Sequence, residues 1–233
     1  MFLTFAIVAV TPTLRAQKQT PQKFNDAIER SESGAEVIRK LAQLQQNGVS
    51  KELIDKAEAL GVFSCKKTDL LVEHGIICPG VISRHLQSGW TLPAFYKFAG
   101  GGFGRPDPAL SHSAAMILLF MDRESLEWLS KAMMLKDEKQ AQAGALGSIT
   151  KEQKAELSNA HIIAYADRKD GLSGENLTGG FWKGIALNQD NHINQGLYSM
   201  KGHEVLSGKA IPSASIPSGI SAFQQALQKY YSR

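Results

Sequence analysis

The sequence predicts an α+β protein in which N- and C-terminal helices pack on an antiparallel sheet that is barrel-like or strongly bent. Three observations support this fold class. Apolar residues recur at helical spacing in residues 22–60 and again in residues 219–231. Between these segments, short apolar runs separated by turn residues indicate a block of strands. Three successive glycines at positions 100–102 favour a sharp bend or bulge within that block.

The first expected elements are helices. One is expected before Gly34 and another after it, with the second ending at residues 47–48. Ser50 is a suitable N-cap for a third helix over residues 51–60. The helices between residues 24 and 44 are amphipathic and carry basic residues. They could lie on a membrane surface, or they could simply pack on the sheet.

The middle of the chain is expected to form strands. The expected strands cover residues 61–65, 70–73, 76–84, 89–104, 113–121, 160–167 and 175–187. The remaining expected helices cover residues 122–134, with Asp122 as the N-cap, and then residues 188–198, 203–206 and 219–231. Residues 136–158 are polar and are expected to form a loop with one helical turn at 150–157.

The segment over residues 89–104 is the most informative part of the chain. In an extended conformation its alternate side chains fall on opposite faces, and both faces carry apolar groups. One face holds Trp90, Leu92, Ala94, Tyr96 and Phe98, and the other holds Thr91, Pro93, Phe95 and Lys97. This pattern predicts a strand that is covered on both sides.

Composition places the chain among ordinary globular proteins. It has 233 residues, of which 43% are apolar and 21% charged, with no internal repeat and no long linker, so a single domain is expected. The net charge of +4 and the pI of about 9.0 are too weakly basic to indicate nucleic acid, but they suit an anionic surface.

The N-terminus has the pattern of a secretory signal. A nine-residue apolar run at residues 2–10 precedes a polar stretch, and Ala16 stands at the expected cleavage position. The run is too short to span a bilayer. We therefore expect residues 1–16 to be a signal peptide and the mature protein to be exported, periplasmic or secreted. No Lys or Arg precedes the run, and without a signal the protein would be cytoplasmic.

The two cysteines leave two alternatives open. Cys65 and Cys78 could form a disulfide if neighbouring strands bring them together, or they could be two buried free thiols. They lack C-x-x-C spacing, which argues against a zinc site or thioredoxin-like chemistry.

Catalytic motifs are weak throughout. The six histidines show no H-E-x-x-H spacing, so a zinc site of that type is not expected. Ser173 stands in G-L-S-G, which is one residue short of a nucleophile elbow. The glycines before Gly104 are not followed by the G-K-[ST] of a phosphate loop. We therefore expect no enzymatic activity, no metal and no cofactor.

Several motifs together resemble one family. Residues 89–104 are similar to the G-W-S-x-P-A-F-x-x-x-G-G-G-S-x-G signature of SYLF domains, which are lipid-binding modules of yeast actin-patch proteins and of bacterial envelope proteins. Further similarities follow in the family's order. They are the segment at 53–62, G-V-I-S-R at 80–84, the apolar run at 116–121, A-G-A-L-G at 143–147 and the segment at 165–174. The resemblance implies that residues 17–233 form a single SYLF-like domain.

The chain also departs from the family pattern. Residues 104–111 contain two prolines and a two-residue insertion where the family has G-L-Q-x-G-A-Q-S. Ala145 replaces the usual proline, and the phenylalanine expected after Leu172 is missing. These differences indicate a divergent bacterial member, to which the actin-related role of the yeast proteins should not be transferred.

The resemblance implies binding to acidic phospholipid headgroups, which in eukaryotic members are phosphoinositides. We expect a peripheral protein of the membrane surface whose site would gather five basic side chains. These are Arg84, Lys97, Arg105, Arg168 and Lys169. The alternative is a structural or protein-interaction component of the cell envelope that binds no specific lipid.

Overall fold

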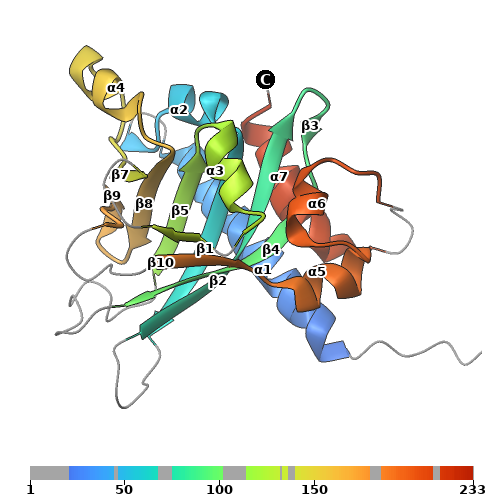
Figure 1. Cartoon of the computed structure of the whole chain (residues 1–233). Coiled ribbons are helices and arrows are strands. Elements are labelled where there is room, and N and C mark those ends of the chain that lie inside the picture. Colours follow the sequence, from blue (N-terminus) through green and yellow to red (C-terminus); the bar gives the residue numbers. More distant parts are fainter. Residues whose placement is uncertain are drawn as a thin grey trace, which may run out of the picture.

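A computed structural model describes residues 21–44, 47–67, 75–101, 114–131, 133–135, 140–178, 185–211 and 216–232. It confirms the α+β class, with helices packed on a mostly antiparallel sheet that curls into a nearly closed, barrel-like shape (Figure 1). The expected signal peptide and Arg105 lie outside the described residues.

The bounds of the helices and strands are as follows. The helices are α1 (Pro21–Gln43), α2 (Lys51–Lys56), α3 (Arg123–Trp128), α4 (Lys151–Leu157), α5 (Asn191–Tyr198), α6 (Gly202–Leu206) and α7 (Ala222–Tyr230), with the short 3₁₀ helix η4 (Ser218–Ser221) before α7. The strands are β1 (Ala59–Lys67), β2 (Gly75–Leu86), β3 (Gly89–Trp90), β4 (Ala94–Gly101), β5 (Ala114–Phe120), β6 (Met133–Leu135), β7 (Ala141–Ala143), β8 (Ile162–Arg168), β9 (Gly171–Gly174) and β10 (Ile185–Gln189).

The described strands pair in the order β6-β10-β4-β2-β1-β5-β8-β7, with β3 added to β2 and β9 added to β8. The end strands β6 and β7 follow each other in the chain, and only residues 136–140 separate them. A link of that length spans at most about 20 Å. The two ends of the sheet must therefore lie close together, which explains why the sheet curls.

One face of the curled sheet forms the inner core. Phe63, Tyr96, Phe98 and Phe120 are fully buried on it, and the rings of Phe63 and Phe98 are 5.8 Å apart. Strand alternation turns the neighbouring residues outward. There α1 and α7 cover part of the outer face (Figure 1). The expectation that the strand at residues 89–104 is covered on both sides is confirmed at the start of β4, where both Phe95 and Tyr96 are buried, but not further along, where Lys97 is 46% exposed.

Several expected boundaries are wrong. The third helix ends at Lys56 and not at residue 60, the strand expected over residues 89–104 is divided into β3 and β4, and residues 175–178 are not in a strand. Helix α1 is continuous through Gly34. A Cβ at this position would lie only 2.9 Å from both Phe223 and Val81. Glycine is therefore needed here for close packing and does not end a helix. The helix that Asp122 caps ends at Trp128, and Met133 already begins β6. The expected loop at 136–158 contains β7 and the full helix α4.

Strand β7 also makes the one parallel pairing among the described strands. It pairs with β8, and the chain crosses from one to the other through α4. Parallel neighbours need such a crossover because a tight hairpin cannot join them. The expected helix start at Asp122 is confirmed, since its side chain accepts a hydrogen bond from the Ser125 N–H at 2.8 Å.

The alternative left open for the cysteines is decided in favour of the disulfide. The pairs Phe63↔Gly80 and Lys66↔Ile77 place Cys65 directly opposite Cys78 on adjacent strands. Their Cα atoms are 4.1 Å apart and their sulfur atoms are bonded. The bond joins β1 to β2 close to the ends of both strands.

Candidate functional site

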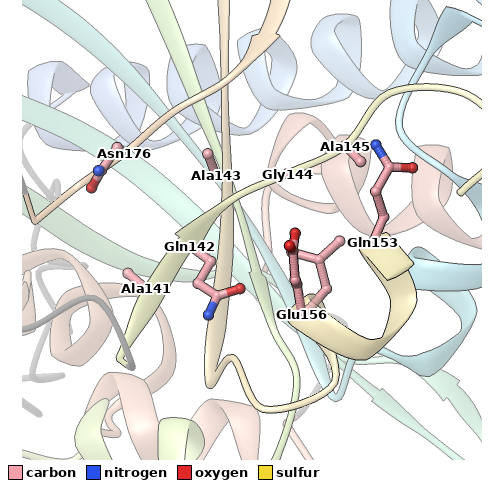
Figure 2. Close-up of a pocket in the computed structure, with 9 residues that line it drawn as sticks. Ala141, Gln142, Ala143, Gly144, Ala145, Gln153, Glu156 and Asn176 are labelled. Atoms are coloured by element: carbon pink, nitrogen blue, oxygen red, sulfur yellow. The ribbon is translucent and has the colours of Figure 1, made fainter. Parts of the chain in front are cut away.

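Several hollows mark the described surface. A groove of ≈ 450 Å³ lies between β7 and α4 (Figure 2). A second hollow of ≈ 650 Å³ runs along the exposed side of α1, and a smaller one of ≈ 150 Å³ lies beside Trp90. Within the part of the chain that the structure describes, no three His, Cys, Asp or Glu side chains are grouped to hold a metal ion.

The expected site residue Arg84 lies near the end of β2. Its backbone pairs with that of Ala59, and its guanidinium Nη2 is 3.5 Å from Glu58 Oε2. About a third of its side chain is exposed. Arg84 therefore forms a surface ion pair at the end of the sheet remote from the disulfide.

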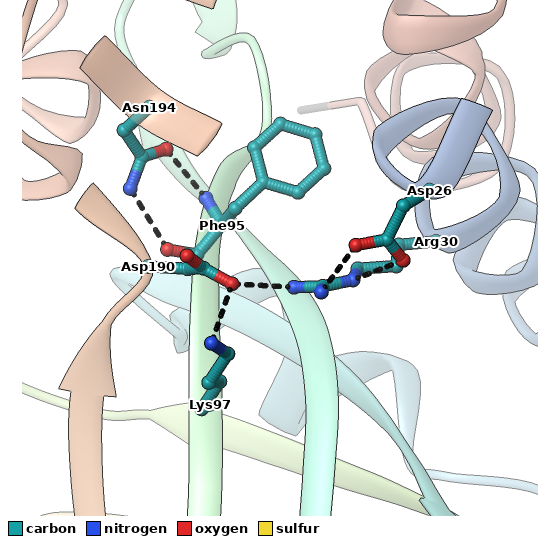
Figure 3. A network of polar contacts seen from close by, with 6 residues as sticks. All are labelled: Asp26, Arg30, Phe95, Lys97, Asp190 and Asn194. Carbon is teal, nitrogen blue, oxygen red and sulfur yellow. Dashed lines mark hydrogen bonds and ion pairs between the residues drawn. The ribbon is translucent and has the colours of Figure 1, made fainter. Parts of the chain in front are cut away.

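Lys97 belongs to a network that joins β4 to α1 and α5 (Figure 3). Its Nζ lies 3.1 Å from Asp190 Oδ2, and Arg30 Nη1 lies 3.0 Å from the same oxygen. Arg30 is also bonded to Asp26 at 2.6 Å. Burial opposes the ionised form of Asp190, but the hydrogen bonds from Arg30 and Lys97 prevail and hold its pKa below the usual value.

Arg168 and Lys169 lie at the turn between β8 and β9. The Arg168 guanidinium donates to Glu175 Oε2 at 2.5 Å and to Ser173 Oγ at 3.0 Å, and only 12% of its side chain is exposed. Asp167 reaches the outer face, where Lys40 of α1 binds it at 2.6 Å. Alternation therefore turns Arg168 to the inner face. Lys169 is exposed in the turn itself.

The four described site residues do not form one cluster. Lys97 stands opposite Pro79 in the register, five residues along β2 from Arg84. Arg168 lies four strands away from Lys97 in the sheet order, and its side chain is on the other face. The expectation that these residues gather in one basic site is therefore not met by the four described residues. The cause is that strand register and side-chain alternation place them on different strands and faces.

Helix α1 packs on the sheet, as the second alternative proposed. Ala27, Ala35 and Ile38 are fully buried, and Arg30 and Lys40 are held by acidic partners. The exposed side of α1 carries acidic residues beside Arg39, and they would be repelled by acidic lipids. These residues are Glu29, Glu32 and Glu36.

An exposed apolar row crosses four strands on the outer face of the sheet. Its members are direct register partners from β6, β10, β4 and β2, namely Met134, Ala186, Ala99 and Ile77. Met134 is 50% exposed and Ile77 is 44% exposed, while the two alanines are half-buried. At the usual strand spacing the row is about 14 Å long. We call these four residues the apolar row.

A lysine stands next to the apolar row. Lys97 is two residues before Ala99 on β4, so it faces the same side, and 46% of its side chain is exposed. The ends of β1 and β4 reach past the helices at the lower left of Figure 1, which leaves this end of the sheet uncovered by α1 and α7.

Sequence reasoning missed the apolar row because no local signal reveals it. Its four residues are spread from position 77 to position 186 and become neighbours only through strand pairing. Met134 was assigned to a helix, and Ile77 resembled an ordinary core residue. A strand prediction at residues 133–135 would have been the one available hint.

A comparison with models of known protein families finds none that matches this chain, and a search of curated proteins finds no significant match. No described helix has the length and apolar character needed to cross a bilayer.

Proposed function

We propose that the protein is a non-enzymatic binder of membrane surfaces that contain acidic phospholipids, and that it docks through the apolar row and Lys97 beside it. The apolar row is the observation that carries the proposal. Ile77 and Met134 are two of the three large apolar side chains exposed on the described surface, and both lie on this one row.

The energetics suit a reversible peripheral contact. About half of the surface of each large side chain in the row is exposed in the free protein. Burying that surface in the interfacial region of a membrane would contribute about 1 kcal/mol of binding free energy per side chain. Each lysine near an anionic surface adds about 1 kcal/mol. Lys97 stands at the row, where Asp190 offsets part of its charge, and the net charge of +4 favours the same surface over a longer range.

Two further observations support this proposal. The order of motifs along the chain is similar to that of SYLF domains, for which lipid binding is the known role. The disulfide between Cys65 and Cys78 is typical of oxidising compartments and supports the export that residues 1–16 predict. We therefore propose a periplasmic or secreted location, peripheral to the membrane.

The test is flotation of the purified protein with vesicles of phosphatidylcholine alone or with about one third phosphatidylglycerol. We expect binding to the acidic vesicles that weakens as salt is raised. The double variant Ile77→Ser with Met134→Ser should bind about ten- to thirty-fold more weakly, because it removes the apolar contribution. The matched control is Leu146→Ser, since Leu146 is also exposed (37%) but lies outside the apolar row.

Binding that ignores headgroup charge, or that survives the double substitution in full, would contradict the proposal. The alternative is a structural or protein-interaction component of the envelope. The same apolar row could be covered by a protein partner, because apolar surface does not by itself distinguish a bilayer from a protein. Loss of cross-linking to envelope proteins in the double variant, without any vesicle binding by the native protein, would favour that alternative.

A further inference from the structure

Among the described strands, β7 has a neighbour on one side only. It is an end strand of the described sheet and pairs with β8 alone. The Gly144 N–H donates to the Ala164 carbonyl at 2.9 Å, and the Ile162 N–H donates to the Gln140 carbonyl at 2.9 Å. In a parallel pair, the backbone N–H and C=O groups of successive residues point alternately toward the neighbouring strand and away from it. The N–H and C=O of Ala143 therefore point away from β8, and Ala143 is exposed.

This edge lines the ≈ 450 Å³ groove. The volume falls within the range of about 300–1,000 Å³ that is typical of ligand sites. Small residues on β7 leave room for a second backbone to approach, while Gln153 and Glu156 of α4 form the opposite wall (Figure 2). The side-chain amides of Gln142, Gln153 and Asn176 can both donate and accept hydrogen bonds.

The walls of the groove are held in place by their own contacts. Glu52 of α2 binds Lys154 of α4 at 2.5 Å and Lys56 at 2.7 Å, and these two bonds lower the pKa of Glu52 to about 2. On the other wall the Tyr165 hydroxyl donates to the Ala145 carbonyl at 3.1 Å. A groove that is already formed loses little freedom when a ligand binds.

We propose that this groove binds a short extended segment of a partner protein, which adds as a strand to β7 at Ala143. Paired N–H and C=O groups on an exposed edge are complementary to another extended polypeptide. Glu156 is the one ionisable side chain among the described residues that line the groove, so it favours a segment with a lysine or arginine and disfavours an anionic ligand. The groove and the apolar row share no residues, so this proposal does not depend on lipid binding.

The test uses the ¹⁵N-labelled full chain and a capped synthetic peptide, Thr-Ala-Lys-Ala-Thr. We expect amide shifts centred on Ala143 and on the groove face of α4, and slower hydrogen exchange at the Ala143 N–H. A second peptide with glutamate in place of the lysine should bind several-fold more weakly, because Glu156 repels it.

Two substitutions at one position separate pairing from folding. Ala143→Pro removes the N–H that faces away from β8, so the β7–β8 ladder is kept while one bond to the added strand is lost. It should weaken peptide binding about tenfold. Ala143→Thr keeps the N–H and favours the strand, so it should bind like the native protein. Unfolding temperatures of both variants show whether each remains folded.

Three outcomes would overturn the proposal. The first is the absence of shifts at Ala143 with millimolar peptide. The second is binding that Ala143→Pro leaves unchanged. The third is a set of β7 shifts that appear with rising protein concentration alone, which would identify a second copy of this chain as the occupant of the edge.

Discussion

At the scale of single residues, two glycines decide whether strands can approach one another. A Cβ on Gly80 would lie 2.3 Å from the Val62 carbonyl oxygen, and one on Gly144 would lie 2.0 Å from the Tyr165 ring. Both distances are far below van der Waals contact. These positions fall in the G-V-x-x-R and A-G-x-x-G motifs of the sequence. Close packing therefore explains both glycines without any role in binding.

Gly80→Ala should lower the free energy of unfolding by about 2 kcal/mol or more, because the obstacle is a backbone carbonyl that cannot rotate away. Urea unfolding measures the change. Shrinking the neighbouring ring with Phe63→Leu should not restore the stability, since the Val62 oxygen remains in place. Recovery in that double variant would show that the side chain, and not the backbone, is the obstacle.

At the scale of elements, buried polar contacts dock α5 and α1 onto β4. Asn194 is fully buried, and its amide accepts from the Phe95 N–H at 2.8 Å and donates to the Phe95 carbonyl at 2.9 Å. Asp190 precedes α5 and binds Arg30 and Lys97, as Figure 3 shows. Helix α5 is thereby held at one register on β4.

Asp190→Asn should destabilise the protein at pH 7 by about 2 kcal/mol, because it leaves Arg30 and Lys97 without their shared carboxylate. The folded-state pKa of Asp190 lies below its ordinary value of 3.8, so its contribution is present above that pH and is lost as the pH falls through the folded pKa. Urea unfolding at pH 7 and pH 3 should show the native protein and the variant converging at the lower pH. Asp26→Asn is the control, since Asp26 is 48% exposed and its loss should cost less than about 1 kcal/mol.

At the scale of the whole molecule, the proposed functions use different strands of the sheet. The apolar row crosses β2, β4, β10 and β6, whereas the groove lies at β7. The two sites share no residues, although the end strands β6 and β7 that carry parts of them lie close together. A protein of this shape could hold a membrane surface and an extended protein segment at the same time.

The disulfide supports the end of the sheet that carries the apolar row. Replacing both Cys65 and Cys78 by serine should lower the free energy of unfolding by about 3 kcal/mol, as expected for a bond that closes a short loop. Denaturant unfolding with and without dithiothreitol measures this effect. The reductant should destabilise the native protein and leave the double variant unaffected. Equal sensitivity of the two proteins would contradict a structural role for the bond.

Local patterns in the sequence were enough to predict much of the fold. The α+β class, the burial of both faces at the start of β4 and the helix start at Asp122 are all confirmed. Each depends on neighbours within a few residues, whose periodicity and capping chemistry act locally. The length of α1 was wrong because the packing of Gly34 against Val81 and Phe223 overrides the local tendency of glycine to end helices.

Only the tertiary structure decided which distant residues meet. Strand register joined Cys65 to Cys78, placed Ile77 and Met134 in one exposed row, and turned Arg168 to the face opposite Lys97. A shift of one residue in register would reverse each of these placements, because strand side chains alternate between faces. The sequence by itself therefore determined the elements and the faces they bury. The pairing of strands far apart in the chain determined the surfaces with which the protein can bind.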